Sequence, residues 1–94
     1  MVKLTVVGRK EDYYAWTLYT WCSELREFLA EELGENVEVE FVEGEGPRLY
    51  VEGMLAFEGV PGEEGYLIEI IKLAYDRVKF SQLPLSARGA GRRP

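Results

Sequence analysis

The sequence predicts an α/β fold, more specifically an α+β two-layer sandwich in which a four-stranded mixed sheet carries two helices on one face. Short stretches of alternating apolar and polar residues indicate the strands. Two longer stretches with apolar residues at three- and four-residue intervals indicate the helices. With 94 residues, the chain has room for one hydrophobic core and not for two.

The first strand and the first helix are predicted in the N-terminal third of the chain. Residues 2–7 alternate in polarity until Gly8 ends the strand. From Tyr14 onward the apolar residues follow the spacing of one helical face, and Gly34 stands where a helix C-cap belongs. The apolar positions of this face are Tyr14, Leu18, Trp21, Cys22, Leu25, Phe28, Leu29 and Leu33.

The start of this helix decides how Cys22 is interpreted. The candidate N-caps are Asp12, Thr17 and Thr20. If the helix begins at Thr20, Cys22 lies in its first turn, where the helix dipole favours a reactive thiolate. We favour Asp12, because the apolar spacing runs unbroken back to Tyr14. In that case Cys22 lies in mid-helix and is buried as a small hydrophobic residue.

Three further strands and a second helix complete the prediction. Residues 37–41 alternate between apolar and acidic residues. Residues 49–51 and 54–57 flank a Glu-Gly turn and are expected to pair as an antiparallel hairpin. The second helix is expected to start at Glu63 and Glu64, since acidic residues suit the positive end of a helix dipole. Its apolar stripe comprises Leu67, Ile70, Ile71, Ala74 and Val78.

The elements follow the order β-α-β-β-β-α, and the alternation gives each strand a side toward the helices. The residues expected on that side are Leu4, Val6, Val37, Val39, Phe41, Leu49, Val51, Leu55 and Phe57. Those expected on the uncovered side include Lys3, Thr5, Val7, Glu38, Glu40, Val42, Arg48, Tyr50, Glu52, Ala56 and Glu58. The folded domain is predicted over 1–78, followed by a basic, flexible tail over 79–94.

Composition excludes several classes of function. The chain has a net charge of −6, no histidine and one cysteine, so the usual zinc, haem and Ser-His-Asp sites are absent. We therefore expect no cofactor and no metal. All 17 acidic residues lie within 1–78, which disfavours nucleic-acid binding. Without a long apolar run or a signal-peptide pattern, we expect a cytoplasmic protein without membrane contact. The abundance of Glu is typical of a thermophilic source.

Exposed aromatic residues are the strongest candidate binding site. At 100° per residue, Tyr13 and Trp16 point away from the apolar stripe of the first helix, and Tyr19 lies on its flank. Large aromatic side chains outside a core suggest burial against a second copy of the chain or another protein. The alternative is an irregular helix start that folds Trp16 back onto the domain.

Residues 46–61, with the sequence Gly-Pro-Arg-Leu-Tyr-Val-Glu-Gly-Met-Leu-Ala-Phe-Glu-Gly-Val-Pro, resemble the C-terminal half of small thioredoxin-like and glutaredoxin-like proteins. The resemblance covers 2–78 in the order of elements and 45–72 in detail. In that family a cis-proline precedes the third strand. The resemblance therefore implies that Pro47 is this proline and that the backbone at Gly46 lies beside the docking site of thiol substrates.

The chain departs from the family at the Cys-x-x-Cys motif that begins the first helix. Glu11 and Tyr14 occupy its two positions, and neither side chain exchanges disulfides. We therefore predict a redox-inactive thioredoxin-like domain that binds a protein partner or self-associates through Tyr13, Trp16 and Tyr19. The alternative is a single-cysteine thiol-disulfide oxidoreductase that uses Cys22 near Pro47.

Overall fold

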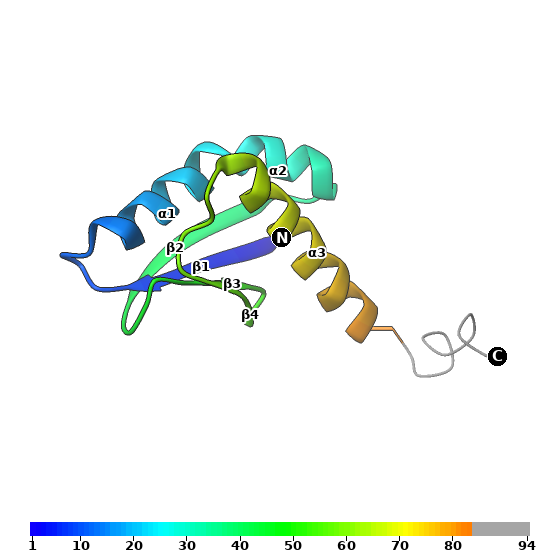
Figure 1. Ribbon diagram of the computed structural model, residues 1–94. Helices are drawn as coiled ribbons and strands as arrows, with labels where there is room; N and C mark the ends of the chain where they lie inside the picture. Colours follow the sequence, from blue (N-terminus) through cyan, green and yellow to red (C-terminus); the bar gives the residue numbers. More distant parts are fainter. Residues whose placement is uncertain (84–94) are drawn as a thin grey trace.

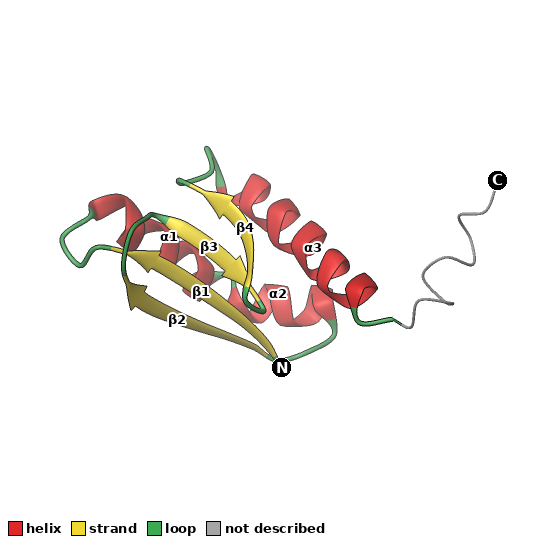
Figure 2. Ribbon diagram, turned by 90° about the horizontal axis from the view of Figure 1, so that it is seen from below, coloured by secondary structure: helices red, strands yellow, loops and turns green. Residues whose placement is uncertain are grey.

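Seven helices and strands form the fold in the computed structural model, which describes residues 1–83. In chain order they are β1 (Val2–Gly8), α1 (Tyr13–Glu24), α2 (Arg26–Leu33), β2 (Val37–Glu43), β3 (Arg48–Val51), β4 (Met54–Glu58) and α3 (Glu64–Ser81). All helices lie on one face of the sheet, and the other face is left uncovered (Figures 1 and 2).

The sheet has four strands in the order β2-β1-β3-β4. β1 pairs in parallel with β2 and antiparallel with β3, which in turn pairs antiparallel with β4. The long α1–α2 connection makes the parallel pair possible, because parallel strands need a crossover. The predicted α+β class and the four-stranded mixed sheet are therefore confirmed.

The predicted first helix is divided into two. Its ends are as predicted: the Asp12 side chain accepts a hydrogen bond from the Tyr14 amide at 2.9 Å, and Gly34 has φ 73°. At Leu25 the backbone turns to φ −88° and ψ 0°, which separates α1 from α2. α1 packs over β1 and β2, whereas α2 reaches β2 and α3. The domain therefore has three helical segments, and the prediction of two was wrong.

The core lies between the sheet and the helices. Its largest fully buried side chains are Val2, Leu4, Val6, Leu18, Cys22, Leu29, Leu49, Val51, Leu67 and Ile71. No polar or charged side chain of residues 1–83 is buried with them. Burial of these apolar surfaces provides the main favourable term for folding.

A β-bulge in β4 changes which of its side chains face the core. Leu49 pairs with Phe57 and Tyr50 pairs with Leu55, so that Ala56 is an extra residue without a partner on β3. The extra residue turns Ala56 toward the core, while Leu55 is 44% exposed on the other face. A bulge shifts the alternation by one residue, which is why simple alternation misplaced both side chains.

The last helix extends three residues beyond the predicted end at Val78. Lys79, which we assigned to the tail, lies in α3 and forms an ion pair with Glu35 at 3.1 Å. The three arginines of the predicted basic tail, Arg88, Arg92 and Arg93, lie outside the described residues.

Candidate functional site

Three loops meet where β1 ends. They connect β1 to α1, β2 to β3 and β4 to α3. The Gly44 amide donates a hydrogen bond to the Gly8 carbonyl at 3.0 Å, and the Gly59 amide donates one to the Pro47 carbonyl at 2.8 Å. The Gly46–Pro47 peptide bond is cis, as the resemblance implied.

Close packing at Gly8 positions the first turn of α1 over these loops. A Cβ atom at Gly8 would lie 2.3 Å from the Cβ of Ala15 and 3.9 Å from the Cα of Pro47. Only a residue without a side chain allows the helix to come this near. Gly8 therefore holds the start of α1 against Pro47.

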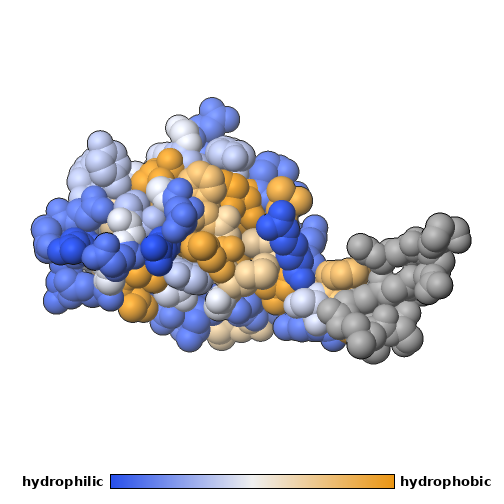
Figure 3. All heavy atoms as spheres, turned by 60° about the horizontal axis from the view of Figure 1, so that its bottom comes forward, coloured by the Kyte–Doolittle hydropathy of each residue, from blue (hydrophilic) through white to orange (hydrophobic). Residues whose placement is uncertain are grey.

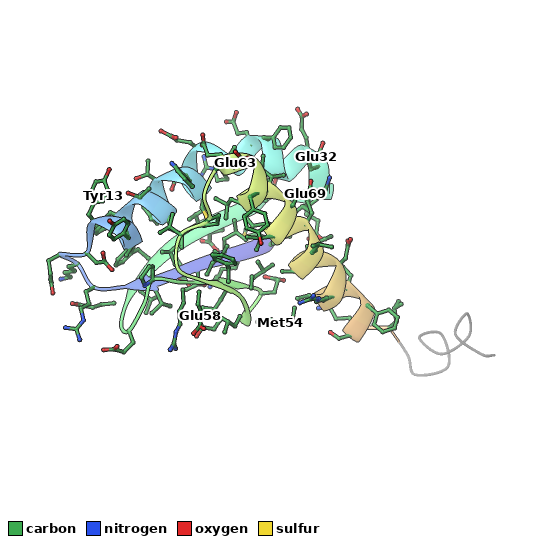
Figure 4. The ribbon with its side chains drawn as sticks, viewed as in Figure 1. Tyr13, Glu32, Met54, Glu58, Glu63 and Glu69 are labelled. Atoms are coloured by element: carbon green, nitrogen blue, oxygen red, sulfur yellow. The ribbon has the colours of Figure 1, made fainter. Side chains whose placement is uncertain are left out.

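Two tyrosines occupy this first turn and are largely exposed. Tyr13 is 76% exposed and Tyr14 is 62% exposed, and their rings make an edge contact with centroids 5.7 Å apart. Figure 4 shows Tyr13 at the free end of α1. Tyr14, Pro47, Gly59 and Val60 line an open hollow of about 360 Å³. We had placed Tyr14 on the buried stripe, and that prediction was wrong.

Trp16 and Tyr19 are folded against the sheet. The Trp16 ring stacks on Phe41 with centroids 4.1 Å apart and planes within 7°. Tyr19 meets both rings edge-on, at 5.5 Å from Trp16 and 5.9 Å from Phe41. The Trp16 indole also donates a hydrogen bond to the Lys10 carbonyl. Trp16 is nevertheless 40% exposed, so part of this cluster is open to a partner.

A second shallow groove of about 370 Å³ runs along the outer side of α1. It is lined by Tyr13, Trp16, Thr17, Thr20, Trp21 and Glu24. Tyr13 belongs to this groove and also forms the ring pair with Tyr14 that flanks the hollow at Pro47. The three predicted binding residues are therefore not equivalent: Tyr13 is exposed, Trp16 is partly open and Tyr19 is half-buried.

Cys22 lies in the core. Its side chain is fully buried, and burial raises the pKa of the thiol to about 12. At neutral pH the thiol is protonated, whereas the nucleophilic species is the thiolate. Cys22 also lies about two helical turns along α1 from Tyr14, the residue beside Pro47. The structure therefore does not bring Cys22 and Pro47 together.

The uncovered face of the sheet is a mixed surface. Figure 3 shows hydrophobic residues in the middle of the molecule's lower face, with hydrophilic residues around them. Its polar residues are paired across the strands: Thr5 donates to Glu40 at 2.9 Å, and Arg48 lies 3.2 Å from Glu58. Such pairing is typical of a solvated sheet face.

Residues 1–83 contain no group of three metal-ligating side chains close enough to share an ion. None of their helices has the length and apolar character that crossing a bilayer requires.

No protein-family model and no curated protein matches this sequence. The site must therefore be interpreted from its own geometry.

Proposed function

We propose that this protein is a redox-inactive, thioredoxin-like domain that binds another protein through the start of α1. The observation that carries the proposal is the exposed ring pair Tyr13 and Tyr14. Tyr14 lies beside Pro47 and occupies one of the two positions of the family's dithiol, and Glu11 occupies the other. In the family, this surface carries out thiol chemistry. In this protein, it presents two aromatic rings.

The arrangement of the strands supports the thioredoxin-like part of the proposal. β1 is central and parallel to β2, and the β3–β4 hairpin is antiparallel to it. Pro47 immediately precedes β3 and faces the first turn of α1 across Gly8. Apart from the division of the first helix into α1 and α2, the strands and helices follow the order from which the resemblance was drawn.

The exposure of the rings supports the binding part. Tyrosine is enriched at the energetic centres of interfaces, because its ring buries a large area and its hydroxyl still finds a hydrogen-bond partner. The hollow formed by Tyr14, Pro47, Gly59 and Val60 gives a partner side chain a place to insert. Trp16 would extend the contact along α1.

The charge of the domain points to a partner with a basic surface. Residues 1–83 carry all 17 acidic residues of the chain. Glu24 lies in the groove along α1, and Glu11 is exposed just before the helix. An acidic surface accelerates encounter with basic partners and disfavours acidic ones.

The burial of Cys22 argues against the single-cysteine oxidoreductase. Disulfide exchange requires a thiolate that reaches the substrate sulfur. Here the thiol is enclosed by the core and its pKa is raised to about 12. Contact rather than electron transfer is therefore the better supported activity.

The test is a quantitative capture experiment with variants of the tyrosines. The immobilised wild-type chain is compared with the double variant Tyr13→Ala/Tyr14→Ala in an extract of the source cells. Any partner of the α1 surface should lose at least about tenfold in affinity, the loss expected for interface aromatic residues. Phe28→Ala is the matched control, because Phe28 is an exposed aromatic residue (47%) on α2.

The expected result is a protein retained by the wild type and by Phe28→Ala and lost from the double variant. Equal retention by all three proteins would contradict the proposed site. Equal thermal stability of the two variants would show that loss of binding does not reflect unfolding.

A further inference from the structure

The groove along the outer side of α1 lies between two tryptophans. Its lining residues are Tyr13, Trp16, Thr17, Thr20, Trp21 and Glu24, and we call it the α1 groove. At about 100° per residue, Trp16 and Trp21 stand about 140° apart around the helix axis, and Thr17 and Thr20 lie between them. The α1 groove therefore has aromatic sides and a floor of threonines.

Both aromatic sides of the α1 groove are held in place by the domain. The Trp16 ring stacks on Phe41, and its indole donates a hydrogen bond to the Lys10 carbonyl. Trp21 is partly buried against the core. Because these side chains are already ordered, a ligand that binds between them costs little additional side-chain entropy.

Two hydrogen-bond donors of the α1 groove have no partner within the domain. The Trp21 indole N–H and the Thr20 hydroxyl make no hydrogen bond with any group of residues 1–83. An indole N–H is a donor only, and a hydroxyl can donate as well as accept. A ligand with free carbonyl groups would satisfy both residues.

The position of the groove on a helix limits the conformation of such a ligand. A strand cannot pair there, because the backbone groups of α1 bond within the helix. A helical ligand already uses its carbonyl groups internally and would leave Thr20 and Trp21 without acceptors. A polyproline II segment has no internal hydrogen bonds, and such segments bind in grooves lined by aromatic side chains.

The C-terminal end of the α1 groove is negative. Glu24 is exposed at the last residue of α1, and the last turn of this helix contains no basic residue. Glu24 forms no ion pair with another side chain of residues 1–83. Arg26, the nearest basic residue along the chain, does not line the groove. The carbonyl end of a helix also favours cations, so a basic ligand residue is preferred here.

We propose that the α1 groove binds a proline-rich segment of a partner protein in the polyproline II conformation, with an arginine or lysine at the Glu24 end. The inference rests on the proposed function, because it names the ligand of the same surface. At 1.5 Å per residue, Tyr13 and Glu24 lie about 16 Å apart along α1. A polyproline II segment of about five residues has this length. The basic residue therefore stands about five residues from the proline that meets Tyr13.

The first test is a titration of the full chain followed by tryptophan fluorescence. Trp16 and Trp21 are the two tryptophans of the sequence, and both line the groove, so their emission reports its occupancy directly. The probe is a synthetic peptide of five prolines between two arginines, which presents a basic residue in either chain direction. One control peptide has glutamates in place of the arginines. The other has alternating serine and glycine in place of the prolines.

We expect saturable binding of the arginine–proline peptide with a dissociation constant below about 1 mM, and binding of both control peptides at least about tenfold weaker. The glutamates would be repelled by the acidic end of the groove. The serine–glycine peptide must be ordered on binding, whereas the proline peptide is already extended. Isothermal titration calorimetry measures the same dissociation constants independently of fluorescence.

Two conservative variants test the contacts. Trp21→Phe keeps an aromatic ring and removes the indole N–H, so it should weaken peptide binding about fivefold, the value of one hydrogen bond. Glu24→Gln should weaken it about threefold, as expected for an exposed ion pair. Glu69→Gln is the matched control and should leave the affinity unchanged, because Glu69 is exposed on α3 and does not line the groove (Figure 4).

No saturable binding of the arginine–proline peptide up to about 1 mM would overturn the proposal. Equal affinity for this peptide and either control peptide would also overturn it. A fluorescence change that depends on the protein concentration alone would assign the groove to a second copy of the chain and exclude the proline-rich ligand.

These outcomes are distinguishable from failure of the proposed function. A partner captured through Tyr13 and Tyr14 by a chain that does not bind the peptide would overturn only the proline-rich ligand. Equal capture by the wild type and the tyrosine variant, together with tight peptide binding, would contradict the tyrosine site and support the α1 groove.

Discussion

The two ends of β1 are built in opposite ways. At its start, Glu35 accepts hydrogen bonds from the Tyr75 hydroxyl and from the N-terminal ammonium at 3.0 Å, and Lys79 lies 3.1 Å away. At its end, Pro47 lines an open hollow with the exposed Tyr14, whose ring contacts that of Tyr13. The first end uses its polar groups to join distant parts of the chain.

The second end carries one ion pair between its loops, Arg9 with Glu45 at 2.9 Å, and leaves aromatic surface exposed. Apolar surface in water costs free energy, so its retention is most easily explained by burial against a partner. The two ends therefore differ in kind: polar side chains join distant segments at the start of β1, whereas close packing at Gly8 and exposed aromatic rings meet at its end, where we propose the binding surface. Three substitutions test this division.

The largest effect is expected from Gly8→Val. The Cβ of the new side chain would lie 2.3 Å from the Cβ of Ala15, and the helix must move away from the sheet. We expect a loss of about 3 kcal/mol in the free energy of unfolding, at the upper end of the cost of overpacking. Gly62→Val is the control, because nothing lies within 4 Å of a Cβ there. Equal stability of the two variants in urea would contradict the close packing at Gly8.

An intermediate effect is expected from Trp16→Ala. The substitution removes the ring that stacks on Phe41 and should lower the free energy of unfolding by about 2 kcal/mol, less than for a fully buried aromatic residue. Tyr13→Ala should cost at most about 0.5 kcal/mol, because that ring is 76% exposed. The free energies of unfolding are measured by denaturant titration. Equal stability of the two variants would contradict the packing of Trp16 against the domain.

The smallest effect is expected from Glu35→Gln and depends on pH. The hydrogen bond from Tyr75, followed by those from the N-terminus and Lys79, lowers the pKa of Glu35 from 4.5 to about 2. A lowered pKa in the folded state stabilises it above pH 4.5, and this stabilisation is lost as the pH falls toward 2. The variant should therefore be less stable than the wild type at pH 7 and equal to it near pH 2. A difference between Glu35→Gln and the wild type that stayed constant at every pH would exclude the network as its cause.

The sequence alone was sufficient to predict features that depend on residues close together in the chain. Asp12 and Gly34 cap the helical segment as predicted, since capping is decided within a few residues. The burial of Cys22 could also be predicted locally, because the apolar residues around it follow helical spacing.

Features that depend on distant residues could not be predicted. Glu35 and Tyr75 are 40 residues apart, and nothing in the local pattern of either indicates the other. The stacking of Trp16 on Phe41 likewise requires the position of β2 under α1. The bulge at Ala56 is a third case, because register is decided by pairing with β3 rather than by alternation alone.

The proposed function depends most on the inaccessibility of the Cys22 thiol. The most direct measurement is the rate at which a maleimide labels Cys22 in the native protein at neutral pH, compared with the rate in denaturant. We predict slow labelling in the native state and rapid, complete labelling after unfolding, because the thiol is buried and protonated. Rapid labelling of the native protein would contradict the redox-inactive function and restore the oxidoreductase hypothesis.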